Sequence, residues 1–240
     1  MNAHAQFATS LFCAVLVATT PGHAQNATAP TAIADAQIRL ALPGHSRQPI
    51  PPAVLWLKPL EPTPAAAFPS RGKYTLLQKN RMFTPHLLVV PVGTEVQFPN
   101  ADPFFHNVFS LFDGKRFDLG LYEAGSSKTV TFSREGVSYI FCNIHPEMSA
   151  VVLSLSTPLY TISDSRGVFH FHDIAPGEYE LHLWVEGVPA TTLDKLTRRV
   201  HLAADTRDLG EVTIPGAMQR DGSHANKFGQ PYDKSDKPAY

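Results

Sequence analysis

Short runs in which apolar and polar residues alternate follow one another along most of the chain, separated by proline and glycine. A strand with one buried face repeats every second residue, so each of these runs predicts a β-strand. Helical periodicity is scarce, and residues 193–200 are the best candidate for a helix. The pattern predicts an all-β fold with strand spacing typical of sandwiches and barrels. The predicted strands cover residues 36–42, 53–57, 74–78, 87–90, 95–98, 108–112, 129–132, 139–142, 150–155, 199–202 and 211–214, with three more inside 160–187.

The two ends of the chain lack this alternation. Residues 7–19 form an apolar run, and small residues precede a cleavage position after Ala24, which predicts a secretory signal peptide over residues 1–24, although no Lys or Arg precedes the run. Residues 25–35 are small and polar and predict a flexible lead-in. Residues 217–240 are polar with both charge signs and predict a loose tail. We therefore expect an exported protein, periplasmic or secreted.

Composition narrows the class of partner. The 240 residues carry a formal net charge of −1 and a pI near 6.8. The chain therefore has no excess of positive charge that would favour binding to a nucleic acid. Outside the predicted signal peptide, no apolar stretch reaches the length of a membrane span. Eleven histidines exceed what packing needs and direct attention to metal chemistry. The sequence leaves the oligomeric state open.

The cysteines point to a specific metal. Cys13 lies in the predicted signal peptide, so Cys142 is the one cysteine that the mature chain would keep. Cys142, His145 and Met148 follow one another on a tight loop after a predicted strand, and His106 begins another strand. A thiolate, an imidazole and a thioether are soft or borderline ligands that suit copper better than calcium or magnesium. Two imidazoles and a thiolate with a weak axial thioether form the donor set of a blue-copper electron-transfer site.

Each of these residues taken alone has an ordinary structural explanation. A single cysteine or methionine is most often a buried hydrophobic side chain, and a single histidine can be satisfied within a turn. The combination of all four in an exported all-β chain predicts a mononuclear copper site. Its ligands would be His106, Cys142, His145 and Met148.

Residues 73–155 resemble a cupredoxin of the plastocyanin and amicyanin type. The resemblance implies a Greek-key β-sandwich in which His106, Cys142 and His145 are equatorial copper ligands and Met148 is the axial ligand. The spacing of Cys142 and Met148 is similar to that of amicyanin, whose ligand loop is short. The matching stretches are Phe83-Thr-Pro85, Val92-Gly93-Thr94 with Val96-Gln-Phe98, Asn100-Ala-Asp102, His106-Asn-Val108, Gly136 and the loop from Cys142 to Met148.

The same resemblance implies roles for neighbouring residues. Asn107 would brace the ligand loop through hydrogen bonds, and His145 would be the exposed ligand through which electrons pass to a redox partner. Glu147 departs from the family, because a carboxylate replaces the apolar residue of amicyanin beside this exit. The identity of the partner therefore does not carry over. His86, in the segment FTPHLLVV, is either an additional ligand or a residue at the rim.

Three further segments together resemble a narrower group, the bacterial cupredoxin-containing proteins labelled methylamine utilisation proteins. These segments are FPNADPFFHNVFSLFDGKRFDLGLYEAGSS, FCNIHPEMSAVV and TPLY. The label reflects kinship with amicyanin-like carriers and does not establish a methylamine pathway for this chain.

Residues 163–187 (SDSRGVFHFHDIAPGEYELHLWVEG) resemble carboxypeptidase regulatory-like, or transthyretin-like, domains, which are small β-sandwiches. The first hairpin of that family is similar to residues 36–58 of this chain. We therefore predict an insertion. Residues 36–70 would supply the first hairpin and a proline-rich linker, residues 71–156 would form the cupredoxin domain, and residues 157–216 would complete the transthyretin-like module.

Three further histidines raise a second metal question. His170 and His172 share one face of a predicted strand, where they could bind a metal together with His182. The alternative is ordinary solvent-facing polar alternation, which needs no third ligand.

Three functions are compatible with these features. The first is a blue-copper protein that shuttles single electrons between redox partners. The second is a copper carrier or store whose transthyretin-like module docks on a protein or a glycan. The third is a copper oxidase or nitrite reductase, which needs further copper centres and a His-Cys-His motif, whereas Cys142 is flanked by Phe141 and Asn143. No catalytic triad or carboxylate pair stands out, so we expect no enzymatic activity.

Overall fold

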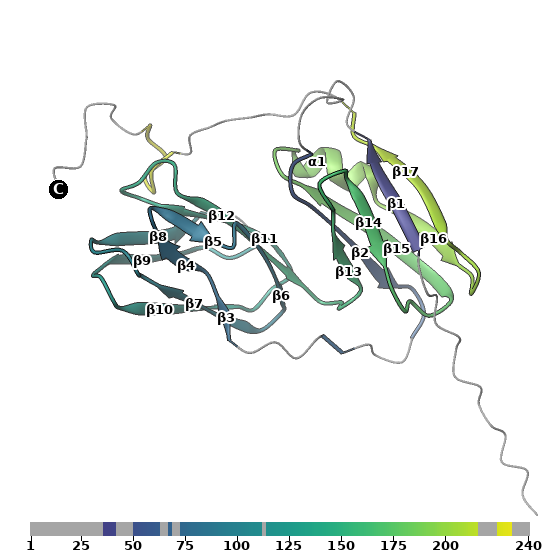
Figure 1. Cartoon of the computed structure of the whole chain (residues 1–240), viewed down its shortest axis with the longest axis horizontal. Coiled ribbons are helices and arrows are strands. Elements are labelled where there is room, and N and C mark those ends of the chain that lie inside the picture. Colours follow the sequence, from purple (N-terminus) through teal and green to yellow (C-terminus); the bar gives the residue numbers. More distant parts are fainter. Residues whose placement is uncertain are drawn as a thin grey trace, which may run out of the picture. The chain divides into compact units, whose positions relative to one another are not determined.

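The computed structural model describes residues 36–41, 50–62, 67–68, 73–111, 114–215 and 225–231. All of these belong to one structural unit, Thr31–Tyr240. The predicted signal peptide and lead-in lie outside the described residues, as do parts of the predicted linker and tail. Strands account for nearly all of the regular structure, so the prediction of an all-β fold is confirmed (Figure 1).

We call the segment from Tyr74 to Leu155 the central module. A five-stranded sheet in the order β6-β12-β11-β8-β9 and a three-stranded sheet in the order β10-β7-β3 form most of it, and β4 and β5 form a separate hairpin. The strands are β3 (Tyr74–Thr75), β4 (Leu77–Lys79), β5 (Met82–Thr84), β6 (Leu87–Pro91), β7 (Thr94–Pro99), β8 (His106–Ser110), β9 (Phe117–Tyr122), β10 (Ser127–Phe132), β11 (Gly136–Cys142) and β12 (Ser149–Leu155).

The two larger sheets of the central module share one hydrophobic core. Along β11 the buried positions alternate with half-buried ones, as expected for a strand with one face on the core. Ile140 and Cys142 of β11 belong to the same buried cluster as Val96 and Phe98 of β7. The module is therefore a β-sandwich whose interior reaches as far as the cysteine at the end of β11.

We call the strands before and after this segment the flanking module. It contains a three-stranded sheet in the order β14-β1-β17 and a four-stranded sheet in the order β13-β2-β15-β16. Both sheets thus combine strands that precede the central module with strands that follow it (Figure 1). The elements are β1 (Ala36–Ala41), β2 (Ala53–Pro59), β13 (Tyr160–Ile162), β14 (Val168–Phe171), β15 (Gly177–Val185), α1 (Ala190–Leu193), the 3₁₀ turn η1 (Asp194–Leu196), β16 (Arg198–Leu202) and β17 (Asp208–Thr213).

The predicted elements differ from the structure in several details, and the strand expected over residues 74–78 is divided into β3 and β4. The helix expected over residues 193–200 is instead the short pair α1 and η1, followed by β16, because Arg198–Leu202 forms a ladder with β15. Strands β5 and β9 were not predicted, and β9 is masked in the sequence by Asp118 and Gly120 inside it. Among the described residues, no helix has the length and apolar content needed to cross a bilayer.

Tyr179 offers a test of the flanking module. Its side chain is 1% exposed, and its hydroxyl donates a 2.7 Å hydrogen bond to the carbonyl oxygen of Ala175. We expect Tyr179→Phe to lower the free energy of unfolding by about 1 kcal/mol, because the carbonyl loses its partner while the packing is kept. Urea denaturation measures the loss. Tyr74→Phe is the control, since the Tyr74 hydroxyl makes no hydrogen bond to another described residue. Equal midpoints for both variants would contradict the expectation.

Candidate metal site

The register between β8 and β11 brings His106 and Cys142 together. The two strands are antiparallel, and Cys142 lies opposite Val108. Directly opposed residues point to the same face of a sheet, and His106 shares that face because it is two residues from Val108. His106 and Cys142 are both fully buried. The sheet therefore holds an imidazole and a thiol side by side in the interior.

The loop from Asn143 to Met148 supplies the other two candidate ligands. Its ends are tied: the Cys142 N–H donates to the Met148 carbonyl at 3.1 Å, and the Asn143 N–H donates to the Asn107 carbonyl at 3.0 Å. Inside the loop, the Met148 N–H donates to the His145 carbonyl at 3.0 Å. Met148 continues the β11–β12 register opposite Cys142, and both side chains lie in the same buried cluster.

Three donor atoms converge at this end of the central module. The Cys142 Sγ lies 3.4 Å from the His145 Nδ1 and 3.6 Å from the His106 Nδ1, and the two Nδ1 atoms are 3.1 Å apart. Among the described residues, these three form the one group of His, Cys, Asp or Glu donors close enough to hold a metal ion. Cys142 takes part in no disulfide.

These spacings fit a common metal ion. Metal–nitrogen bonds of about 2.0 Å and metal–sulfur bonds of about 2.3 Å, the lengths found in zinc sites, separate nitrogen from sulfur by about 3.5 Å at tetrahedral angles. They separate two nitrogens by about 3.1 Å at a slightly smaller angle. The observed separations match these values, so Cys142, His106 and His145 could ligate one ion without rearrangement.

Asp102 fixes the orientation of His106. One carboxylate oxygen of Asp102 lies 2.9 Å from the His106 Nε2, and both side chains are buried. The same carboxylate accepts the backbone N–H groups of Asn80 at 2.6 Å and Arg81 at 3.0 Å. Because an ionised carboxylate only accepts hydrogen bonds, the His106 Nε2 carries the proton. The His106 Nδ1 lone pair is then directed at the other two donors, as metal-binding imidazoles require.

The Asp102 carboxylate also stabilises a turn whose backbone conformation is unfavourable for one of its residues. Asn80 and Arg81 connect β4 to β5, and both have a φ of +56°. Left-handed conformations are uncommon for residues other than glycine, and arginine is not among those enriched there. Burial raises the pKa of Asp102, but the N–H donors of Arg81 and Asn80 and the contact with His106 outweigh it, so the pKa is lowered. Asp102 therefore remains an anion at neutral pH.

Burial keeps both imidazoles neutral. It lowers the pKa of His106 despite the opposing effect of Asp102. It also lowers the pKa of His145 to about 4, with further lowering from the neighbouring His106 and Arg81. Neutral imidazoles have the lone pair that a metal needs. At neutral pH, neither imidazole has to release a proton before it can bind an ion.

The thiol of Cys142 is in the opposite situation. Burial raises its pKa, although backbone N–H groups of Asn107, Ile144 and His145 act to lower it. The buried thiol thus keeps its proton until a cation supplies the compensating charge. The three N–H groups would then stabilise the thiolate, since hydrogen bonds to a charged form favour it.

The structure corrects the expected exposure of His145. The family resemblance implied an exposed ring, but His145 is only 4% exposed, and its Nε2 is buried with no partner among the described residues. The Phe104 ring lies 5.4 Å from the His106 ring and 5.5 Å from the His145 ring, measured between centroids. The Arg81 guanidinium lies over Phe104, 5.2 Å from its centre. Phe104, from the loop between β7 and β8, therefore packs against both imidazoles. Glu147, on the loop that carries His145, is exposed.

Asn107 contacts the loop through its backbone. The Asn143 N–H bonds to the Asn107 carbonyl, whereas the Asn107 side-chain amide donates to an Asp118 carboxylate oxygen at 2.6 Å. The roles of Asp102, Phe104 and Asp118 were not predicted from the sequence. Only Asp102 had a signal in the sequence, since it stands four residues before His106.

The structure does not bring His86 to this group. The His86 Nε2 lies 2.6 Å from a carboxylate oxygen of Glu186, and its Nδ1 lies 3.2 Å from the Ser149 carbonyl oxygen. Both ring nitrogens are engaged, so the structure does not support ligation by His86.

The three histidines of the flanking module are also apart. His170 lies within β14 and His182 on β15, and these strands belong to different sheets. The His182 ring bonds to Glu180 at 2.6 Å and stacks on Trp56. His172 is exposed just beyond β14. They form no donor group among the described residues.

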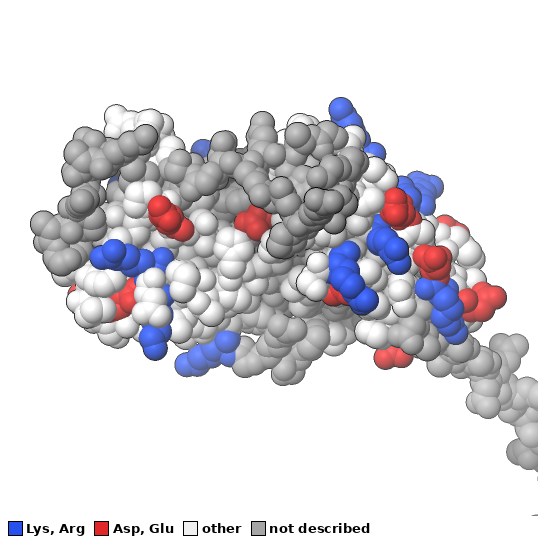
Figure 2. All heavy atoms as spheres, turned by 45° about the horizontal axis from the view of Figure 1, so that its top comes forward, with Lys and Arg blue, Asp and Glu red and all other residues white. Residues whose placement is uncertain are grey.

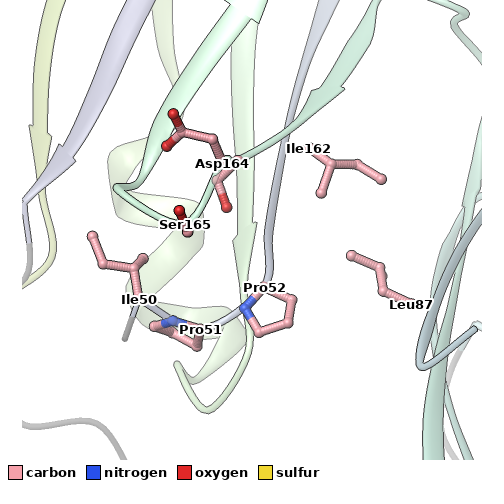
Figure 3. Close-up of a pocket in the computed structure, with 8 residues that line it drawn as sticks. Ile50, Pro51, Pro52, Leu87, Ile162, Asp164 and Ser165 are labelled. Atoms are coloured by element: carbon pink, nitrogen blue, oxygen red, sulfur yellow. The ribbon is translucent and has the colours of Figure 1, made fainter. Parts of the chain in front are cut away.

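Two other surface features carry no comparable chemistry. A hollow of about 320 Å³ is lined by Ile50, Pro51, Pro52, Leu87, Ile162, Ser163, Asp164 and Ser165 (Figure 3). Its one carboxylate, Asp164, is engaged by the backbone N–H groups of Arg166 and Val168. Figure 2 shows acidic and basic side chains interspersed over the described part of one face, in keeping with the small net charge.

Asp102 provides a test that needs no metal. We expect Asp102→Asn to lower the free energy of unfolding by about 1.5–3 kcal/mol, because two backbone N–H groups lose a charged acceptor. We also expect His106 to lose its fixed tautomer. Urea denaturation and nitrogen NMR of the imidazole measure the two effects. Asp164→Asn is a matched control, since Asp164 also accepts two backbone N–H groups in a turn. An unchanged tautomer in Asp102→Asn would refute the assigned role.

The His86–Glu186 pair gives a pH-dependent prediction. The hydrogen bond to Glu186 raises the pKa of His86 more than burial lowers it. A raised pKa in the folded state adds stability that is complete below the ordinary value of about 6.5 and is lost as pH rises through the folded-state pKa. We expect His86→Gln to reduce the urea midpoint more at about pH 5.5 than at about pH 9. The effect should stay below about 1 kcal/mol, since both side chains are partly exposed. Glu186→Gln should behave alike; a loss that is the same at both pH values would exclude the charged pair.

Comparison with known proteins yields partial similarities. No protein-family model and no curated protein matches the chain. Among solved structures, a purple cupredoxin from Nitrosopumilus maritimus is similar, with 26% identity over 35% of this chain and 100% of that chain, and a TM-score of 0.32. A copper-containing nitrite reductase from Thermus scotoductus SA-01 has 25% identity over 41% of this chain and 25% of that chain, with a TM-score of 0.33. A mutant of amicyanin in its reduced state has 22% identity over 42% of this chain and 99% of that chain, with a TM-score of 0.33.

Proposed function

We propose that this chain is an exported mononuclear type 1 (blue) copper protein that carries single electrons. His106, Cys142 and His145 would be the equatorial ligands and Met148 the weak axial ligand. The observation that carries the proposal is the convergence of one sulfur and two imidazole nitrogens at 3.1–3.6 Å in a buried place.

The donor set favours copper in two oxidation states. Thiolate and thioether sulfur are soft ligands that suit Cu(I), and imidazole also suits Cu(II). When bound, the copper ion would supply reversible one-electron chemistry. Two of the donors sit on adjacent strands of a packed sheet and a third on a loop tied at both ends. Such fixed donors would change little in position between the two oxidation states.

The surrounding residues prepare the donors for an ion. Asp102 holds the proton of His106 on Nε2 and leaves Nδ1 available. The backbone N–H groups of Asn107, Ile144 and His145 act to lower the pKa of Cys142 and would stabilise its thiolate. Phe104 packs on both imidazoles and helps to exclude water from them. Each effect favours a bound cation over a proton or a water molecule.

The cellular setting and the partner are part of the same proposal. A signal peptide cleaved after Ala24 would export the protein to the periplasm or the medium. A redox partner would dock near His145, where the exposed Glu147 would contribute to its choice. The flanking module would be a transthyretin-like sandwich interrupted by a cupredoxin domain. In keeping with this, β1 pairs with β14 and β17, and β2 pairs with β13 and β15.

One observation favours a second candidate, a periplasmic copper store or carrier. His145 is buried, and no imidazole edge of the donor group is open to solvent. A shielded ion exchanges electrons slowly with a partner but is well protected from loss. In this alternative, the flanking module would dock on a protein or a glycan that receives the copper.

Copper titration of the purified chain tests the proposal. We expect one equivalent of Cu(II) to produce an intense sulfur-to-copper absorption band with a reversible one-electron couple. Cys142→Ser should abolish the band completely, because the sulfur is its origin, while His86→Ala should retain it. Very tight binding of colourless Cu(I) without fast electron exchange would favour the store instead. Preference for Zn(II) with no coloured copper form would contradict both candidates.

A further inference from the structure

The described part of the C-terminal region, Ala225–Pro231, forms a turn that is closed by its own hydrogen bonds. The Asn226 Oδ1 accepts the backbone N–H groups of Phe228 and Gln230, both at 3.0 Å. The Gly229 N–H donates to the Asn226 carbonyl at 2.8 Å, and the Asn226 N–H donates to the Gln230 carbonyl at 2.8 Å. The polar composition of residues 217–240 predicted a loose tail, and this turn was not predicted. Its shape is set within the segment, so it can act as a preformed ligand.

The turn is bound to the central module through Lys227. The Lys227 backbone N–H donates to the Asn143 Oδ1 at 2.9 Å, and the Lys227 Nζ lies 2.8 Å from the Asp118 Oδ2. One residue thus uses its main chain and its ammonium group on two different acceptors. Figure 1 shows the segment, in yellow, beside the central module.

Both acceptors are part of the frame that holds the candidate ligands. Asn143 follows Cys142 directly and precedes His145 by two residues, and its own N–H is bonded to the Asn107 carbonyl. The other carboxylate oxygen of Asp118 accepts the Asn107 side-chain amide at 2.6 Å and the Gly120 N–H at 2.9 Å. These two N–H groups already stabilise the Asp118 anion without the turn, so the acceptor site exists before the turn arrives.

We infer that Asn143 and Asp118 form a receptor for the chain's own turn 225–231, and that the bound turn restricts access to the loop between Cys142 and His145. The receptor itself concerns only polar groups and is independent of copper. The restriction of access rests on the proposed function, because it concerns electron transfer through this loop. A partner that docks on the loop has to displace the turn, which makes the C-terminal segment a competitor for the docking surface.

The chemistry of the receptor defines what it accepts. It offers an amide oxygen and a carboxylate, and it binds a segment that presents a backbone N–H and an ammonium group from the same residue. A tethered segment benefits from an effective concentration in the millimolar range, so the same segment as a free peptide should bind weakly. Weak intrinsic binding allows a docking partner to displace the turn from its receptor.

Three forms of the protein test the receptor: the full chain, a chain ending at Pro231 and a chain ending at Pro215. The chain ending at Pro231 keeps the turn and serves as the matched control. A synthetic peptide of residues 222–233 is titrated into the chain ending at Pro215 without copper and followed by NMR. We expect saturable shifts at Asn143, Asp118 and Asn107. A peptide with Lys227→Met should bind about two- to fivefold more weakly, as expected for a partly exposed ion pair.

The access of reductant is measured in the same three chains loaded with Cu(II). We expect ascorbate to reduce the chain ending at Pro215 faster than the other two, and added peptide to slow it again. Absence of shifts at the receptor, or shifts equal for both peptides, would overturn the receptor. Equal reduction rates in all three chains would overturn the restriction of access. A failure of all three chains to form a coloured copper complex would refute the proposed function instead, while the titration still decides on the receptor.

Discussion

The antiparallel register between β8 and β11 is the constraint on which the candidate site depends. It sets Cys142 opposite Val108 and so turns His106 and Cys142 to the same buried face. A slip of one residue would send one of the two side chains to the opposite face of the sheet, away from its partner. The alternating core residues of β11 resist such a slip, because it would also expose Ile140. The packing that stabilises the sandwich is therefore the same packing that positions the donors.

Asp102 extends this dependence to a neighbouring hairpin. Its carboxylate joins the left-handed turn at Asn80 and Arg81 to the imidazole of His106. The hairpin in turn places Arg81 over Phe104, which packs on both imidazoles. Strand register, turn conformation and imidazole orientation are thus coupled through a single buried anion. A change in any one of them would alter the positions of the donor atoms.

The fold class and the candidate donor set could be predicted from the sequence because the signals for both are mainly local. Alternation marks strands within five or six residues, and three of the four candidate ligands fall within the seven residues from Cys142 to Met148. Packing between residues far apart in the chain could not be predicted from these local patterns. The burial of His145 depends on Phe104, which lies far away along the chain, and the docking of Lys227 joins residues 84 and 109 positions apart. Strand β9 was missed since Asp118 and Gly120 interrupt its alternation, although one of them proves to hold Asn107.

The pairing of β2 with β13 and β15 has a consequence for the order in which the chain folds. The Thr157 hydroxyl bonds to the Leu57 carbonyl across 100 residues of sequence, a span that contains the whole central module. Closing an unstructured loop of that length costs roughly 4 kcal/mol in chain entropy, and contacts of such long range form slowly. A central module that folds first shortens the effective loop and presents its two ends for pairing. During synthesis, β1 and β2 leave the ribosome early but remain without their sheet partners until the last strands emerge, so they depend on rapid folding of the segment between them.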